Sequence, residues 1–174
     1  VGLHLSLEIF KIRYGWKRDD EIITTPLTFV STNHAILYSG FKPIFADVDE
    51  TLCLDPSSVL EKITNKTKAV IFVGIGGNAG NLDKIQKICK ERKLKLILDA
   101  ANMAGTFVNS DNPIHVGHEA DTTVFSFQAV KNLPTADSGM ICFRDREDLE
   151  LCKKLSWLGI DKDTFSRTTS NGSY

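Results

Sequence analysis

Three polar residues stand out in this sequence because each ends or follows a strongly apolar run: Asp99, Ser126 and Lys131. Asp99 closes the run Leu-Ile-Leu-Asp. A buried acid in such a place needs a cationic partner or several hydrogen bonds, since desolvation of an unpaired carboxylate is costly. Asp99 could cap the next turn, or it could pair with a protonated ring nitrogen of a bound cofactor.

Ser126 and Lys131 are five residues apart and form a second group. Taken alone, Ser126 could be a satisfied hydroxyl and Lys131 a solvated surface charge. Together they fit another task, because a hydroxyl at a strand end can hold a phosphate while a nearby lysine forms an imine with an aldehyde. Imine formation requires a lysine that can lose its proton near neutral pH, which burial and positive neighbours favour. With Asp99 keeping a pyridine nitrogen protonated, the three residues predict pyridoxal 5′-phosphate (PLP) as cofactor.

Alternating strands and helices must position these residues. Short apolar runs rich in Ile, Val and Phe predict strands over residues 21–25, 43–47, 69–73, 94–99, 122–127 and 140–143. Helices are expected over 28–39, 56–64, 81–92 and 146–158, and residues 1–7 already have the pattern of an amphipathic helix. This alternation predicts an α/β fold of three layers, α/β/α, with a mostly parallel sheet.

Several residues mark the ends of the predicted helices. Asp55 can cap a helix that has Pro56 in its first turn, Asn81 precedes another, and Gly40 can stop a third. In parallel sheets a ligand binds beyond the carboxyl ends of the strands. The polar residues there, Asp99 and Ser126 with Lys131 close behind, are therefore expected to meet.

Composition excludes several classes of protein. The chain has 174 residues, of which 42% are hydrophobic and 25% charged, with a net charge of −1. This balance argues against a nucleic-acid or membrane surface as the main partner. No apolar run approaches the roughly 20 residues that cross a bilayer, and no signal peptide is recognisable, so we expect a cytoplasmic protein. The four cysteines form no metal-binding pattern and are expected to be structural thiols.

Three motifs occur in a characteristic order: PLTFVST over residues 26–32, LDAAN over 98–102 and FSFQAVKN over 125–132. Together with KPIFADVD over 42–49, they resemble the DegT/DnrJ/EryC1/StrS family of sugar aminotransferases. That family has the aspartate-aminotransferase fold (fold type I), and the resemblance extends from Val1 to about Leu158. It implies the large PLP-binding domain over 1–163, truncated at both ends, and the start of a connection to a C-terminal small domain over 164–174.

The resemblance also implies a role for each matching residue. Lys131 would form the Schiff base and move the proton between cofactor and substrate, Asp99 would pair with the pyridine nitrogen, and Ser126 would hold the phosphate. Phe29 would stack on the cofactor ring, and Ala101 would pack against its other face. The alternative for Phe29 is an ordinary core aromatic.

Two positions depart from the family pattern. Asn102 stands where relatives often have Gln or His in contact with the cofactor's 3-hydroxyl, so that contact is expected to be shorter or lost. The stretch over 135–139 keeps only one glycine of a usually glycine-rich loop. The Gly-rich run over 74–80 could suggest a phosphate loop, but it matches no dinucleotide fingerprint, and we interpret it as backbone permissiveness.

The resemblance implies transfer of an amino group from an amino acid, usually L-glutamate, to a keto group on a nucleotide-linked deoxysugar. Such a reaction would serve the synthesis of cell-surface polysaccharides or of sugars in secondary metabolites. It also implies a homodimer, with a phosphate loop upstream of Val1, so residues 1–174 alone are expected to be inactive. A non-catalytic relative and a nucleotide-binding domain without PLP are the alternatives, but the first has no need of Asp99, Ser126 and Lys131 together. The second should have a glycine fingerprint after the first strand.

Overall fold

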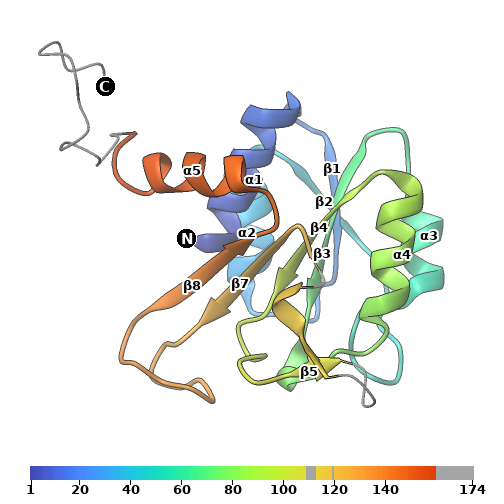
Figure 1. Cartoon of the computed structure of the whole chain (residues 1–174). Helices are drawn as coiled ribbons and strands as arrows, with labels where there is room; N and C mark the ends of the chain where they lie inside the picture. Colours follow the sequence, from blue (N-terminus) through green and yellow to red (C-terminus); the bar gives the residue numbers. More distant parts are fainter. Residues whose placement is uncertain (109–112, 119, 160–174) are drawn as a thin grey trace, which may run out of the picture.

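A six-stranded sheet forms the centre of the molecule in a computed structural model that describes residues 1–108, 113–118 and 120–159 (Figure 1). The strands lie in the order β2 (Lys42–Phe45), β1 (Glu21–Thr24), β3 (Thr67–Val73), β4 (Lys95–Asp99), β7 (Thr122–Ser126) and β8 (Gly139–Phe143). The first five are parallel, and β8 pairs antiparallel with β7. The sheet is therefore mostly parallel, as the sequence predicts.

Helices cover both faces of the sheet (Figure 1). On one face α1 (Gly2–Tyr14), α2 (Val30–Tyr38) and α5 (Arg146–Leu155) enclose a core with Ile22, Ile71 and Ile97. On the other, α3 (Pro56–Lys62) and α4 (Leu82–Arg92) pack on Ile23, Phe72 and Leu98. Alternate residues of one strand thus face opposite helical layers. The predicted three-layer α/β/α class is confirmed.

The predicted helix ends hold in part. The Asp55 side chain accepts hydrogen bonds from the backbone N–H groups of the first turn of α3, and Gly40 follows α2 with a φ of 81°. Asn81 stands at the N-cap of α4, but its side chain donates to Asp49 Oδ2 at 2.7 Å and caps no helix. An amide can donate as well as accept, so Asn81 precedes the helix as predicted while its side chain bonds elsewhere.

Other differences concern element lengths. The first helix extends to Tyr14, α2 begins only at Val30, and α5 ends at Leu155. Two short 3₁₀ helices, η1 (Ile75–Gly77) and η2 (Val116–His118), and the two-stranded sheet of β5 (Phe107–Val108) and β6 (Ile114–His115) were not predicted. Elements of two or three residues are too short to show a hydrophobic period. The predicted domain boundary between residues 163 and 164 lies outside the described residues.

Among the described residues, no helix combines the length and apolar character that crossing a bilayer requires. All four cysteines are free, and three of them are buried.

Candidate cofactor site

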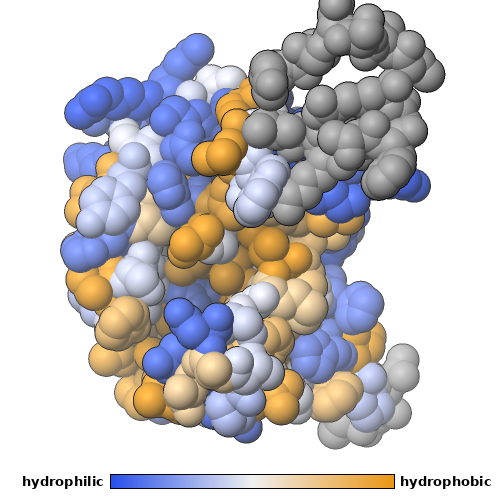
Figure 2. All heavy atoms as spheres, turned by 90° about the vertical axis from the view of Figure 1, so that its left-hand side faces the viewer, coloured by the Kyte–Doolittle hydropathy of each residue, from blue (hydrophilic) through white to orange (hydrophobic). Residues whose placement is uncertain are grey.

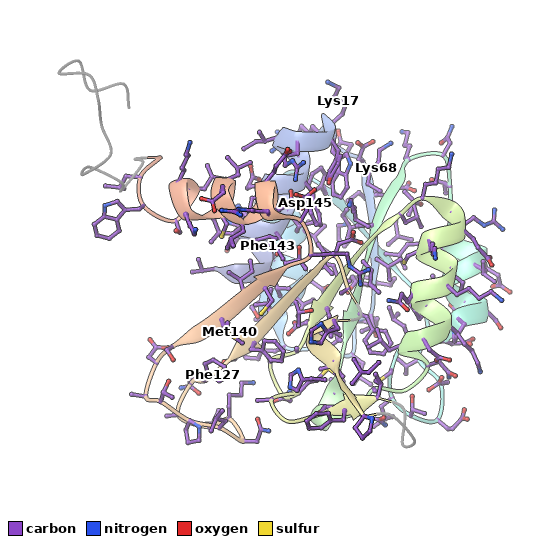
Figure 3. The ribbon with its side chains drawn as sticks, in the orientation of Figure 1. Lys17, Lys68, Phe127, Met140, Phe143 and Asp145 are labelled. Carbon is purple, nitrogen blue, oxygen red and sulfur yellow. The ribbon has the colours of Figure 1, made fainter. Side chains whose placement is uncertain are left out.

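The carboxyl ends of the parallel strands meet at one edge of the sheet. In Figure 3, Lys68 near the start of β3 lies at the upper end of the molecule and Phe127, which follows β7, at the lower end. A cavity of about 760 Å³ opens between this edge, the β7–β8 pair and the first residues of α1. Figure 2 views the side of the molecule on which β8 and the amino end of α1 lie, where apolar side chains surround a hollow. All six predicted site residues line the cavity: Phe29, Asp99, Ala101, Asn102, Ser126 and Lys131.

Asp99 lies deep in the cavity wall, at the end of β4, and only 7% of its surface is exposed. Thr32 Oγ1 donates to Asp99 Oδ2 at 2.7 Å, and the backbone N–H of Ala101 donates to Asp99 Oδ1 at 3.2 Å. Burial raises the pKa of Asp99, while these two hydrogen bonds and the charge of Lys131 oppose the rise. Both hydrogen-bond donors are neutral, so the carboxyl group is suited to a cationic partner.

Lys131 returns over the same edge on the loop between β7 and β8. Its Nζ atom donates to Asn102 Oδ1 at 3.1 Å, and the neighbouring Asn132 Nδ2 donates to the backbone oxygen of Ala104 at 2.6 Å. These two bonds join the loop that carries the lysine to the turn that follows Asp99. Asn102, predicted as a cofactor contact, thus binds the lysine directly in this structure.

Ser126 is the last residue of β7, and its hydroxyl is half-buried. It accepts a long hydrogen bond of 3.4 Å from the backbone N–H of Gln128. The cavity wall also includes Val1, Gly2 and Leu3 at the amino end of α1. A Cβ atom at Gly2 would lie 2.6 Å from Val124 Cγ1, so a glycine there allows α1 to approach β7 closely. A hydroxyl beside a helix amino terminus is a suitable place for an anion such as phosphate.

Phe29 lies at the cavity with 76% of its surface exposed. It was predicted inside a helix, but its φ of −67° and ψ of 140° are extended, and it is the N-cap of α2. The alternative of an ordinary core aromatic is therefore wrong. Ala101, half-buried, lies in the same wall in the turn after β4.

Sequence reasoning missed two threonines of the site. Thr32 is fully buried beneath Asp99, and its Oγ1 lies 2.8 Å from Oγ1 of Thr28, which lines the cavity. Both belong to the motif over residues 26–32. Only Thr32 lies in α2, since Thr28 precedes its N-cap Phe29, so no helical spacing in the sequence could have shown that the two hydroxyls meet.

Left-handed backbone conformations occur in both loops that the sequence singled out, over residues 74–80 and 135–139. Ala136, in the glycine-poor stretch beside the cavity, has a φ of 72°, in the left-handed region that favours glycine. Gly77 in the run over 74–80 has a φ of 86°, and a Cβ there would lie 2.9 Å from the backbone oxygen of Asn102. The interpretation of this run as backbone permissiveness agrees with that close approach.

Comparison with known proteins supplies independent information. The sequence model of the DegT/DnrJ/EryC1/StrS aminotransferase family matches residues 1–173. The spore coat polysaccharide biosynthesis protein SpsC of Bacillus subtilis is 39% identical over 100% of this chain and 43% of its own length. The aminotransferase TlmJ from Streptoalloteichus hindustanus is 38% identical, with a TM-score of 0.83, over 92% of this chain and 42% of that chain.

Two further solved structures have bound ligands. NtdA from Bacillus subtilis, determined with the cofactor PMP, is 29% identical with a TM-score of 0.81, over 97% of this chain and 38% of that one. DesI, determined in the presence of its TDP-sugar product, is 30% identical with a TM-score of 0.78, over 92% of this chain and 40% of that one. The chain thus spans less than half the length of the proteins it matches.

Proposed function

The chain belongs to the DegT/DnrJ/EryC1/StrS aminotransferase family, whose members depend on PLP, and from this premise we propose that its cavity holds PLP bound covalently by Lys131. One observation carries the proposal. Asp99 from β4, Ser126 from β7 and Lys131 from the loop after β7 line a single cavity, although 32 residues separate the first from the last. A purely structural protein would have no need to collect an acid, a hydroxyl and a lysine around an open cavity.

The residues present fit the cofactor in size and chemistry. A cavity of about 760 Å³ is within the range of small-molecule sites. Asp99 is a buried carboxyl group whose hydrogen-bond donors are both neutral, and a protonated pyridine nitrogen would supply the positive charge it lacks. The exposed ring of Phe29 offers an aromatic face that a planar ligand could cover.

When bound, PLP supplies an electron sink that eases removal of a proton from the carbon bearing the amino group. The protein's own residues would do the rest. Ionised Asp99 would hold the ring nitrogen in its protonated form, and Ser126 would bind the phosphate near the amino end of α1. Lys131 would hold the cofactor and move the proton through Nζ, the atom that donates to Asn102 Oδ1 in this structure. Phe29 and Ala101 would pack against the ring.

For the reaction of the whole protein we propose amino transfer from an amino acid, L-glutamate in the first instance, to a keto group of a nucleotide-linked deoxysugar. Family membership supports the amino transfer. SpsC is named for spore coat polysaccharide biosynthesis, and DesI was solved with a TDP-sugar product, which supports the class of acceptor. Cell-surface polysaccharide or secondary-metabolite synthesis is the corresponding biological setting.

We further propose that the active protein is a cytoplasmic homodimer and that residues 1–174 alone are inactive. Phe29 and Val130, 76% and 82% exposed, lie at the cavity and would be covered by a second copy. The free thiols suit a reducing compartment. The matched relatives are more than twice as long as this chain, so further residues can contribute to the site.

The test uses the full-length protein and follows its absorbance. Addition of PLP to the apoprotein should produce a yellow complex, and L-glutamate should convert its spectrum in a single turnover. Lys131→Ala should bind PLP only noncovalently and show no conversion. Lys153→Ala, which changes an exposed lysine on α5, is the control and should behave as the wild type. A wild-type protein that takes up no PLP would contradict the proposal.

A further inference from the structure

A chain of hydroxyl groups runs from the cavity wall to Asp99. Thr28 is half-buried in the wall, Thr32 is fully buried, and their Oγ1 atoms lie 2.8 Å apart. Thr32 Oγ1 in turn lies 2.7 Å from Asp99 Oδ2. Both threonines belong to the segment that starts α2, whereas Asp99 ends β4, so the chain connects two layers of the fold.

The charge of Asp99 fixes the direction of these hydrogen bonds. An ionised carboxylate only accepts, so the single hydroxyl proton of Thr32 must point at Asp99. Thr32 then has only lone pairs to offer Thr28, so the hydroxyl of Thr28 must donate to Thr32. Each donor strengthens the next, and every dipole of the chain is oriented to stabilise a negative charge on Asp99.

We propose that Thr32, supported by Thr28, is a positioning residue that keeps Asp99 ionised and fixes its orientation toward the ring nitrogen of the cofactor. This inference rests on the proposed function, because it concerns the same site. Thr32 occupies Oδ2 and the Ala101 N–H occupies Oδ1, one on each carboxylate oxygen, so the carboxyl plane is fixed from both sides. Neither threonine needs to touch the cofactor for this effect.

Few other groups around Asp99 affect its pKa, so the hydroxyl chain has a large share in it. Lys131 is the charged group that acts on Asp99, and it favours the ionised form. The strand neighbours in register with Asp99, Val73 on β3 and Val124 on β7, carry no charge and offer no side-chain hydrogen bond. Desolvation raises the pKa of Asp99, and the Thr32 hydroxyl is the largest opposing influence.

The experiment compares isosteric variants of the full-length protein in two measurements. The first is the dissociation constant for PLP, from absorbance titration of the apoprotein. The second is the acid limb of the pH profile for the half-reaction with L-glutamate. In Thr32→Val we expect PLP to bind about tenfold more weakly and the acid limb to move upward by about one pH unit, the effect of losing one hydrogen bond to a charge. The shift is upward because a raised pKa leaves less Asp99 ionised at low pH.

Three other variants make the test specific. Thr32→Ser keeps the hydroxyl and should restore the wild-type affinity and acid limb. Thr28→Val removes only the second donor, so it should weaken PLP binding by about threefold and move the acid limb upward by about half a pH unit. Thr28 lies on the cavity wall, so this variant carries the test if Thr32→Val does not fold. Thr122→Val is the matched control, since Thr122 is buried on β7 and its hydroxyl has no partner among the described residues.

The outcomes separate this inference from the proposed function. A wild-type protein that binds no PLP contradicts the proposed function and the inference with it. If the wild type binds PLP and Thr32→Val matches it in affinity and acid limb, only the role of Thr32 is overturned. The same conclusion follows if Thr32→Ser behaves like Thr32→Val, since the loss would then come from packing.

Discussion

Two buried aspartates, Asp99 and Asp148, show how differently this fold treats the same side chain. Asp99 is 7% exposed and faces the cavity, whereas Asp148 is 1% exposed on α5 and faces α1. Burial raises the pKa of both. At Asp148 the guanidinium of Arg13, 2.6 Å from Oδ1, opposes the rise, whereas at Asp99 the hydrogen bonds come from a hydroxyl and a backbone N–H.

Ion pairs of Arg13 join α1 to the first turn of α5. Arg13 also reaches Asp145 at 3.0 Å and Glu147 at 2.5 Å, and Figure 3 labels Asp145 at the start of α5. The Arg13 guanidinium thus pairs with three carboxylates, and the buried one, Asp148, has its cation within the protein, which is typical of a structural ion-pair cluster. At the cavity edge, Asp99 accepts hydrogen bonds only from neutral donors, and Lys131 acts on it without a direct ion pair. A buried acid therefore indicates a binding site when no cation of its own fold is bonded to it directly.

The sharpest test of this comparison is the same substitution at both aspartates. Asp99→Asn in the full-length protein should lower the rate of the half-reaction with L-glutamate by about a hundredfold, because the charge that stabilises the protonated ring is lost. Asp148→Asn should leave the rate per folded molecule unchanged. Stopped-flow absorbance measures both, and equal rates for Asp99→Asn and the wild type would remove Asp99 from the mechanism.

In stability, by contrast, Asp148→Asn should have the larger effect and Asp99→Asn the smaller. Asp148→Asn should lower the free energy of unfolding by about 2 kcal/mol, because it leaves the guanidinium of Arg13 without its buried partner. We place the loss below that of a fully isolated charge because Asp145 and Glu147 remain within reach. Asp99→Asn should cost little or nothing. Urea unfolding of the apoproteins measures these differences, and a larger loss in Asp99→Asn would contradict the structural assignment of Asp148.

Much of this contrast could be predicted from sequence, but not all of it. The acid at the end of an apolar strand indicated Asp99, and the rule that parallel strands end at one edge predicted Ser126 and Lys131 as its neighbours. Phe29 was expected there only from the family resemblance. Nothing in the sequence indicated that Asn102 would bind Lys131 or that Thr32 would lie beneath Asp99. Those contacts depend on how α2 and the loop after β7 pack, which no local period encodes.

The start of α2, the end of α5 and the short β5–β6 pair were also not predicted correctly from the sequence. Phe29 was predicted within the helix over 28–39, yet its extended backbone makes it the N-cap of α2. Boundaries of this kind are set by where the chain leaves the sheet edge, which is a tertiary property.

The pH dependence of stability gives a smaller contrast at Asp99 itself. Because burial raises its pKa, the folded apoprotein holds this proton to higher pH than the unfolded chain does. The associated stability is fully present below the ordinary value of 3.8 and is lost as the pH rises through the raised pKa. Asp99→Asn lacks this loss, so relative to the wild type its unfolding free energy should improve as the pH rises. A difference that does not change with pH would mean that Asp99 has no raised pKa.

The smallest expected effect concerns backbone strain beside the cavity. Ala136 adopts a φ of 72°, where a Cβ atom costs about 1 kcal/mol, while a glycine costs slightly less than that in unfolded-state entropy. Ala136→Gly should therefore raise the free energy of unfolding by about 0.5 kcal/mol or less. Thermal unfolding of the apoprotein measures it. A clear loss of stability would indicate that Ala136 is not strained.

Covalent labelling tests whether Lys131 is the residue that holds the cofactor. The full-length protein is incubated with PLP, reduced with borohydride, digested and analysed by mass spectrometry. The structure places Lys131 Nζ 3.1 Å from Asn102 Oδ1 in the cavity that also contains Asp99 and Ser126. We expect the reduced label on the peptide containing Lys131 and no label in Lys131→Ala. A label on any other lysine of the wild-type protein would show that Lys131 does not hold the cofactor.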